Sequence, residues 1–284
     1  MTSLVALWTD VRKRLEAAGV DSPVIDARLL VEAGAGVSRL DIITEPRREL
    51  TDTQVAAAQA LADRRVAREP LAHIIGTRHF WKQELRVSPD VLIPRPETEL
   101  LVEAALQALP FAEPARVLDL GVGSGAILFA VLAERPLATG LGVDLSNEAL
   151  AVAQANAALL GLGPRVDFKQ GDWCAAIDEV FDVVLSNPPY IASDEIEGLE
   201  PEVARFEPRL ALDGGRDGLD AYRAILPSLA RLLRPGGLFA LEVGLGQAEE
   251  VARLAEQAGL EGVLSKADLA GIPRVVQGIS PGPA

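Results

Sequence analysis

Residues 116–125 read RVLDLGVGSG, an apolar run that leads into a turn rich in glycine. The run predicts a buried β-strand over 116–120, and a helical pattern over 126–134 starts directly after the turn. Glycines in such a turn let backbone N–H groups approach a ligand at the start of a helix. A glycine-rich turn alone, however, is also typical of tight packing between a helix and a strand.

The chain beyond residue 98 alternates strands and helices, which predicts an α/β fold with a mostly parallel sheet. We expect further strands over 141–144, 166–169, 181–186, 238–242 and 274–279. Helices are expected over 147–160, 222–233 and 247–257, the second of them broken or started near Pro227. The sequence Arg-Pro-Gly-Gly at 234–237 is expected to turn into the strand that follows it.

Polar residues follow the ends of successive predicted strands. Asp144 ends one of them, where a carboxylate can accept hydrogen bonds from ribose hydroxyls. Asp172 and Trp173 follow the next strand and supply a polar edge and an aromatic wall for an adenine. Together with the turn over 121–125, these residues favour an adenosyl ligand. The turn has the spacing Gly-x-Gly-x-Gly rather than Gly-x-Gly-x-x-Gly, which disfavours a nicotinamide-dependent dehydrogenase.

Residues 186–190 read SNPPY and follow an apolar strand, so Asn187 is expected where a parallel strand delivers its carboxyl end into a ligand crevice. Pro188 and Pro189 remove two backbone donors and fix φ at both positions. The result is a stiff corner that presents the Asn187 amide, bare carbonyls and the ring of Tyr190. Such a corner suits a planar group that carries an NH2. The alternative is a proline-rich strand exit that takes part in no chemistry.

Residues 1–70 have the pattern of a small helical bundle. Helices are expected over 3–18, 22–33, 38–43 and 51–68, the last of them opened by a capping box. Such a bundle either docks a partner or only stabilises the fold. Residues 71–97 are expected to form a hairpin linker, with short strands at 73–76 and 85–87 around Phe80 and Trp81.

The composition limits the classes of protein to which this chain can belong. The chain has 284 residues, its single cysteine is Cys174, and no apolar run approaches the roughly 20 residues of a membrane span. It opens without a signal-peptide pattern, so we expect a cytoplasmic protein with no membrane partner. We expect no metal site, because no cysteine or carboxylate cluster has ligand spacing with His73 or His79.

The charge is unevenly placed along the chain. Residues 1–86 carry 13 Lys and Arg against 12 Asp and Glu, whereas the remainder carries 14 against 29. An acidic second half is a poor non-specific binder of nucleic acid, so no nucleic-acid partner is expected. This acidity either attracts a basic protein surface or only aids solubility.

The residues discussed above carry a specific resemblance. Segment 119–125 with Asp144, Asp172 and the strand pattern resembles the class I S-adenosylmethionine-dependent methyltransferases. Residues 187–190 resemble the motif of members that methylate planar nitrogens. Five further stretches are similar to the release factor glutamine methyltransferases (PrmC/HemK family), and the similarity spans nearly the whole chain: 70–76, 80–81, 92–99, 205–208 and 268–274. Val122 departs from the Thr that is more usual there, although its backbone can still serve.

The resemblance implies a fold and a reaction. The fold is a Rossmann-like, seven-stranded methyltransferase sheet over 98–284, preceded by a helical substrate-docking domain over 1–70 and the hairpin linker over 71–97. In the reaction, S-adenosylmethionine donates a methyl group to the side-chain nitrogen N5 of a glutamine, leaving S-adenosylhomocysteine. That glutamine belongs to the Gly-Gly-Gln motif of class 1 peptide chain release factors.

The resemblance also implies site residues. Those for the cofactor are Gly121, Val122, Gly123, Ser124, Gly125, Asp144, Asp172, Trp173 and Asn187. Those for the substrate are Asn187, Pro188, Pro189 and Tyr190, with Asn187, Pro188 and Tyr190 also expected to be catalytic. The Asn187 oxygen and the Pro188 carbonyl would accept the two amide hydrogens while Tyr190 stacks on the amide. The roles of Arg95, Glu97 and Glu207 stay open, because these residues either line the cleft or brace it.

Other readings remain open at this point. A sister enzyme that methylates a ribosomal protein is similar around 187–190 but differs around 93–98. An adenine-N6 methyltransferase of nucleic acid shares the same motif, although this chain lacks a stripe of Lys and Arg. A cofactor-binding adaptor without activity is a third possibility. We expect the protein to be a monomer.

Overall fold

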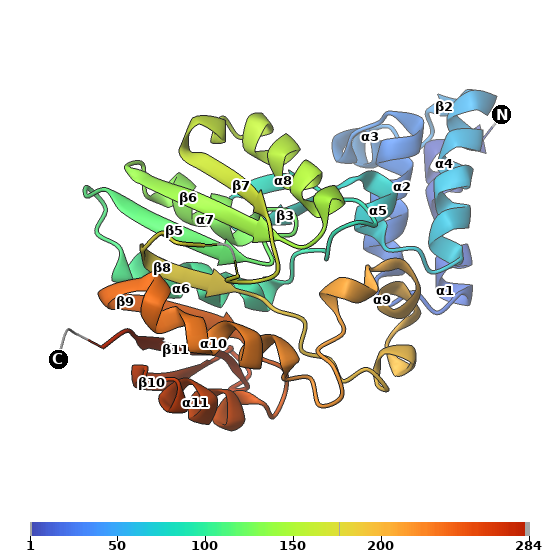
Figure 1. Cartoon of the computed structure of the whole chain (residues 1–284). Coiled ribbons are helices and arrows are strands. Elements are labelled where there is room, and N and C mark those ends of the chain that lie inside the picture. Colours follow the sequence, from blue (N-terminus) through green and yellow to red (C-terminus); the bar gives the residue numbers. More distant parts are fainter. Residues whose placement is uncertain (1, 176, 282–284) are drawn as a thin grey trace. The chain divides into compact units, whose positions relative to one another are not determined.

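The computed structural model describes residues 2–175 and 177–281, and these fall into two compact units (Figure 1). The first, the helical unit, consists of residues 2–76 together with Glu200–Phe206. The second, the sheet unit, consists of the described residues of Thr77–Leu199 and of those from Glu207 onward. Within these described residues, no helix has the length and apolar character needed to cross a membrane.

Helices make up most of the helical unit. In chain order they are α1 Leu4–Ala17, α2 Pro23–Ala35, α3 Arg39–Thr44, α4 Asp52–Val66 and α5 Leu71–Ile75, and the strands β1 Thr2–Ser3 and β2 Glu49–Leu50 pair with each other. The capping box predicted at Thr51 opens α4, and a second capping box, at Ser38, opens α3. A Cβ on Gly34 would lie 2.4 Å from the Cα of Ala58, so glycine is needed where α2 crosses α4.

A short helix from the second half of the chain completes the helical unit. This helix, α9 Pro201–Phe206, carries Glu202, whose Oε1 accepts hydrogen bonds from Arg65 Nη1 at 2.8 Å and from Arg68 Nε at 2.6 Å. Arg65 also donates from Nε to Asp26, which is buried. Burial alone would raise the pKa of Glu202, but the hydrogen bonds from Arg68 and Arg65 lower it to about 2. The cluster therefore holds α9 firmly within the helical unit.

The predicted strand at 73–76 is wrong, because this stretch is part of α5. The backbone N–H groups of His73 and Ile74 donate to the Pro70 carbonyl, and Gly76 ends the helix with φ +83°. Four residues of mixed apolar pattern cannot separate a strand from a helical turn. The hairpin itself follows, with β3 Thr77–Phe80 paired antiparallel to β4 Gln83–Arg86.

The predicted seven-stranded α/β sheet is confirmed. Its strand order is β10-β11-β9-β8-β5-β6-β7, and the five strands β5 to β9 run parallel. Strand β11 runs antiparallel to both of its neighbours, β9 and β10. The bounds are β5 Ala115–Leu120, β6 Ala138–Asp144, β7 Val166–Gln170, β8 Phe181–Ser186, β9 Leu233–Glu242, β10 Glu261–Ala267 and β11 Pro273–Ile279. Strand β10 was not among the strands expected from the sequence.

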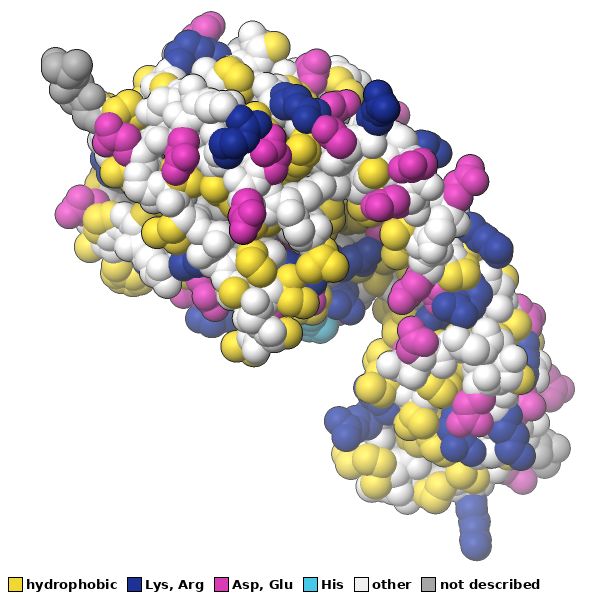
Figure 2. All heavy atoms as spheres, turned by 90° about the horizontal axis from the view of Figure 1, so that it is seen from below, with side chains coloured by type: hydrophobic (Ala, Val, Ile, Leu, Met, Phe, Trp, Pro, Cys, Tyr) yellow, Lys and Arg dark blue, Asp and Glu magenta, His cyan; other side chains and the backbone are white. Residues whose placement is uncertain are grey.

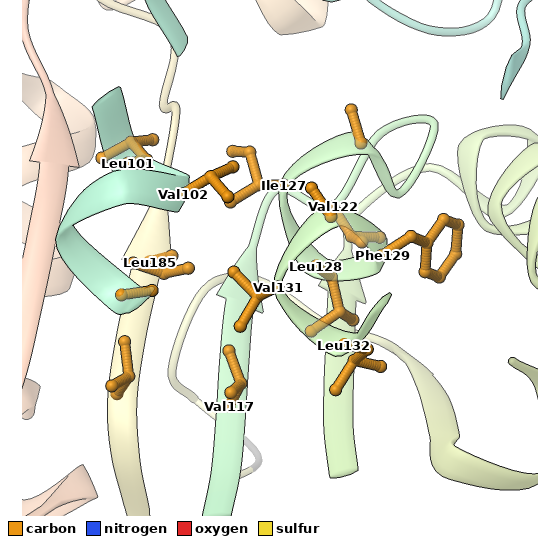
Figure 3. Packing of buried hydrophobic residues seen from close by; sticks show 14 of the residues in the cluster. Leu101, Val102, Val117, Val122, Ile127, Leu128, Phe129, Val131, Leu132 and Leu185 are labelled. Atoms are coloured by element: carbon orange, nitrogen blue, oxygen red, sulfur yellow. The ribbon is translucent and has the colours of Figure 1, made fainter. Parts of the chain in front are cut away.

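Helices cover both faces of this sheet and bury its apolar side chains. On one face lie α6 Glu99–Ala108, α7 Ala126–Glu134 and α8 Asn147–Leu159, and on the other lie α10 Asp220–Leu232 and α11 Ala248–Gln257. Figure 3 shows how Ile127 and Val131 of α7 meet Val102 of α6 and Val117 of β5. Helix α7 is buried over almost its whole length, which fixes the glycine-rich turn before it.

Two further predictions are corrected by the structure. Helix α10 runs unbroken through Pro227, because its apolar face stays packed against the sheet on both sides of the exposed proline. Residues 234–237 lie within β9 rather than ahead of it. They form an irregularity in the pairing with β8. Leu233 pairs with Phe181, but the next pair is Leu238 with Val183, so β9 carries extra residues between these two pairs.

Candidate active site

A cavity of about 470 Å³ opens at the carboxyl ends of β5, β6, β7 and β8. This is the edge at which open α/β sheets bind ligands, and the volume suits a small molecule. Of the residues predicted for the cofactor and substrate, the cavity is lined by Gly121, Val122, Gly123, Ser124, Asp144, Asp172, Trp173, Asn187 and Pro189. Gly125, Pro188 and Tyr190 do not line it.

The glycine-rich turn is locked in a conformation that only glycine adopts easily. Gly121, Gly123 and Gly125 have φ values of +72°, +52° and +86°. A Cβ on Gly125 would lie 2.0 Å from Cε2 of Phe129, so this glycine makes room for a core ring and not for a ligand. The N–H groups of Gly121 and Val122 both donate to the Val143 carbonyl.

Val122, the departure from the family pattern, contacts the neighbouring strand. A Cβ on Gly142 of β6 would lie 2.9 Å from its Cγ2 atom, so the Val122 side chain packs over the backbone of that glycine. The substitution therefore places apolar volume against an apolar surface, and the course of the turn depends on backbone contacts.

Asp144 joins the end of β6 to the glycine-rich turn. Its Oδ2 accepts a hydrogen bond from Gly123 N at 2.9 Å, and its Oδ1 accepts one from Ser146 N at 3.0 Å. Burial raises the pKa of Asp144, while these backbone hydrogen bonds act in the opposite direction. Each oxygen can accept a further hydrogen bond, so the carboxylate is oriented and still able to bind hydroxyls in the cavity.

Trp173 and Asp119 complete the surroundings of the turn. A Cβ on Gly121 would lie 3.6 Å from Cζ3 of Trp173, so the outer edge of the indole lies against the turn, and Trp173 lines the cavity. Asp119, on β5, is fully buried, and neither of its oxygens accepts a hydrogen bond of good geometry from another described residue. Burial raises the pKa of Asp119 well above its usual range.

The corner after β8 places its amide at the cavity. Ser186 is buried and donates to the Leu120 carbonyl at 2.6 Å, which ties the strand end to β5. Asn187 lines the cavity, and its Nδ2 donates to Thr98 Oγ1 at 3.2 Å. Within the described part of the chain, its Oδ1 accepts no hydrogen bond. The Asn187 oxygen is therefore available to a group in the cavity.

Tyr190 points elsewhere than its sequence motif suggests. Its hydroxyl donates to Glu242 Oε1 at 3.2 Å, and burial raises its pKa. The ring packs with the core between the sheet and α10 and α11. In this structure, Tyr190 braces the corner from behind instead of forming the cavity wall.

Arg95 and Glu207 form a brace below the cavity. Arg95 Nη2 donates to Glu207 Oε2 at 2.6 Å, and the Glu207 side chain is 1% exposed. Burial raises the pKa of Glu207, and the charge of Arg95 opposes this. The neighbouring residue Pro208 lines the cavity while Glu207 does not, so this ion pair fixes the chain that forms the wall.

Several lining residues were missed by the sequence reasoning. They come from two loops, 89–94 and 208–213, and from Thr98, Leu145 and Ser146. The last two follow Asp144 directly, so proximity to a strand end could have indicated them. The loops follow no predicted strand end of the sheet. Only the family resemblance of 92–99 and 205–208 pointed to parts of them, and the fold brings them to this edge.

Comparisons with known proteins match nearly the whole chain. The family model described as PrmC N-terminal domain matches residues 6–76, and the model described as Methyltransferase domain matches residues 112–271. The release factor glutamine methyltransferase of Caulobacter vibrioides is 52% identical over 98% of this chain and 96% of its own length. That of Rhodospirillum rubrum is 49% identical over 92% of this chain and 80% of its own length.

Among solved structures, the catalytic domain of hMettl16, in complex with the MAT2A 3′UTR hairpin 6, is similar with a TM-score of 0.59. The match covers 84% of this chain and 88% of that chain at 14% identity. At this identity the likeness concerns the fold alone.

Proposed function

This chain belongs to the family of release factor glutamine methyltransferases, and we propose that its cavity binds S-adenosylmethionine beside a corner that holds the substrate glutamine. The observation that carries this proposal is the hydrogen bonding of the Asn187 side-chain amide. Its amide nitrogen donates to Thr98, whereas its oxygen has no hydrogen-bond partner among the described residues, and the residue lines the cavity. An amide of a substrate can supply the missing donor.

The residues of the cavity fit an adenosyl cofactor. The turn of 121–125 presents backbone at close range, Asp144 offers oriented acceptor oxygens for ribose hydroxyls, and Trp173 gives a flat wall with Asp172 at its edge. When bound, S-adenosylmethionine supplies an electrophilic methyl group on a sulfonium and leaves as S-adenosylhomocysteine. The protein itself binds and orients the two reactants.

The corner 187–190 activates a poor nucleophile by positioning it. The lone pair of an amide nitrogen is delocalised into its carbonyl, so the nitrogen must pyramidalise before it accepts a methyl group. Asn187 Oδ1 accepts a hydrogen bond from one N–H group of the substrate amide. The carbonyl of Pro188, which is not among the residues that line the cavity, is proposed to accept from the second N–H group once the substrate is bound. Neither Pro188 nor Pro189 has an N–H, so the corner offers acceptors without competing donors. Positioning of this kind contributes up to about 7–11 kcal/mol to a barrier reduction.

No strong base is needed in this scheme. Transfer forms a bond from nitrogen to the methyl carbon, and the methylated nitrogen then carries one proton too many. An N-protonated amide is a strong acid and releases that proton to water. Accordingly, we assign no residue of this chain as general base.

The substrate is proposed to be the glutamine of the Gly-Gly-Gln motif of class 1 release factors, methylated on N5. Two glycines beside the target suit entry into a narrow cleft, because they carry no side chains. The helical unit is proposed to dock the release factor. On the face shown in Figure 2, acidic side chains are interspersed with basic ones instead of gathered in one patch. The attraction is therefore proposed to come from the net charge of the second half of the chain.

Mass spectrometry tests the assignment directly. Purified class 1 release factor is incubated with this protein and S-adenosylmethionine, and its peptides are analysed. The expected result is a gain of one methyl group on the glutamine of the Gly-Gly-Gln peptide. A release factor whose target glutamine is replaced by alanine is the control. Methylation of a ribosomal protein or of nucleic acid in parallel reactions, with none on the release factor, would overturn the proposal.

A further inference from the structure

The turn that follows β9 holds Tyr190 at both ends. The Tyr190 hydroxyl donates to Glu242 Oε1 at 3.2 Å, and Gln247 Nε2 donates to the Tyr190 carbonyl at 2.8 Å. Gln247 is itself fixed, because its Oε1 accepts a hydrogen bond from Gly244 N at 2.9 Å. Residues 242–247 therefore clamp the last residue of the proposed substrate corner from behind.

The fit of this clamp is tight. A Cβ on Gly218 would lie 2.3 Å from the Tyr190 carbonyl oxygen. A Cβ on Gly244 would lie 2.8 Å from Gln247 Oε1 and 3.1 Å from Tyr190 Cδ2. Glycines at both positions allow the two backbones to approach the ring and the carbonyl of Tyr190 closely.

Glu242 links this clamp to Asn187 through Thr98. Glu242 is 2% exposed and ends β9, next to the point where Leu241 pairs with Ser186 of β8. Thr98 is 3% exposed, and its Oγ1 accepts the hydrogen bond from Asn187 Nδ2. Burial raises the pKa of Glu242, and the Thr98 hydroxyl beside it is the largest influence that lowers it.

The direction of these hydrogen bonds decides which end of the Asn187 amide faces the cavity. A hydroxyl has a single proton, so Thr98 can donate either to Glu242 or to Asn187. Glu242 Oε2 is buried and accepts no hydrogen bond from the described residues in the geometry present, which leaves it open to this proton. When Thr98 donates to Glu242, its oxygen must accept from the Asn187 NH2. The Asn187 oxygen is then turned to the cavity.

We propose that Glu242 is a positioning residue that fixes the orientation of the Asn187 amide through Thr98, while Gln247 holds Tyr190. Only the kinetic consequence rests on the proposed function; the orientation itself is a property of the chain. Glu242 does not line the cavity, so it acts on the substrate through Asn187 and touches no reactant.

Nuclear magnetic resonance tests the orientation without any substrate. The chain has three asparagines, Asn147, Asn156 and Asn187, so protein labelled with 15N-asparagine gives three side-chain amide signals. Replacing Glu242 by Gln exchanges a carboxylate that only accepts hydrogen bonds for an amide whose NH2 can donate to Thr98, so the Thr98 proton is no longer drawn away from Asn187. We expect the Asn187 signal to shift or broaden while the Asn156 signal, from an amide bonded to the Arg86 and Ser124 carbonyls, stays in place.

A matched control is available on β8, the strand that precedes Asn187. Asp182 lies at the opposite end of β8, accepts a hydrogen bond from Arg116 N and pairs with Arg234 at 2.6 Å. Asp182→Asn makes the same change from carboxylate to amide, and all three signals should persist. An unchanged Asn187 signal in folded Glu242→Gln would overturn the proposal. If that variant does not fold, Thr98→Val should displace the signal and Thr98→Ser should restore it; identical spectra for these two would also overturn it.

Kinetic measurements on Glu242→Gln distinguish the loss of a positioning residue from a general loss of structure. Glu242→Gln should lower kcat about 10- to 100-fold, the effect of losing one well-placed acceptor, with KM for release factor and Kd for cofactor changed less than about threefold. In an Asn187→Ala background, the same change should have little further effect, because its target is gone. Additive losses in the double variant would refute the link between Glu242 and Asn187. Failure of the unaltered protein to methylate release factor would refute the proposed function instead and leave the spectroscopic result standing.

Discussion

Replacing Asn187 by Ala in the full chain removes the acceptor that the proposed mechanism depends on. The Asn187 oxygen would bind an N–H whose nitrogen gains positive charge during methyl transfer, so that hydrogen bond is charge-assisted and contributes about 1.5–3 kcal/mol. The side chain is held by Thr98 and by the two prolines that follow, so little reorganisation is needed during the reaction. The substrate amide is also less well positioned in the variant. Together, the two effects should raise the activation free energy of methyl transfer by about 3 kcal/mol, which lowers kcat roughly 100-fold.

The assay compares three quantities for this variant. Single-turnover transfer of a tritiated methyl group to release factor gives the rate, calorimetry gives the Kd for S-adenosylmethionine, and a thermal melt reports folding. We expect a slow rate with Kd and melting temperature near the parent values. Asp182→Asn, at the opposite end of β8 from Asn187, is the control and should keep the parent rate. A rate for Asn187→Ala within about threefold of the parent would show that the oxygen is not the substrate acceptor.

Further predictions concern binding, stability, pH and salt. Asp144→Ala should weaken cofactor binding by about 10-fold or more in calorimetry, and unchanged binding would reject its contact with the ribose. Gly125→Ala should lower the melting temperature, because its Cβ would lie 2.0 Å from the Phe129 ring at φ +86°, whereas Gly163→Ala, with open space around it, should have little effect. At pH 7, Glu202→Gln should reduce the free energy of unfolding by about 3 kcal/mol in urea titrations. Because the folded pKa of Glu202 is lowered to about 2, this stabilisation is complete above its usual pKa near 4.5 and is lost as the pH falls from there toward 2; equal losses at pH 7 and pH 2 would contradict the assignment. The KM for release factor should rise with salt, and a flat response would indicate that the acidity serves solubility.

Much of the sheet unit follows from the sequence because its strands are buried on both faces. Such strands are nearly continuous apolar runs, and the bounds predicted for α7 and β8, 126–134 and 181–186, agree with the structure. Strand β10 escaped prediction because it lies at the sheet edge and most of its side chains are exposed, so its sequence lacks an apolar pattern. Residues 73–76 were misassigned because so short a run carries no periodicity.

Some residues of the candidate site could be predicted from the sequence, and others could not. Residues at strand ends, such as Asp144 and Asn187, could be located from sequence because parallel strands bring their carboxyl ends to a common edge. Glu242 could not be linked to Asn187, since the link depends on β9 lying beside β8 and on Thr98 of a different segment. The motif likewise suggested that the Tyr190 ring faces the ligand, whereas its hydroxyl is bound to Glu242. Which of these residues act on substrate stays a prediction for the experiments above.

Helix α9 determines how this protein can be truncated or combined with segments of its relatives. The chain passes into the helical unit at Glu200 and out again after Phe206, and the next residues, from Pro208, form part of the cavity wall. A deletion that starts the protein at residue 77 would leave Glu202 without Arg65 and Arg68, so α9 would lose the hydrogen bonds that fix it. A chimera that takes its N-terminal helices from a relative should therefore also take segment 200–206 from that relative, because the two segments fold together.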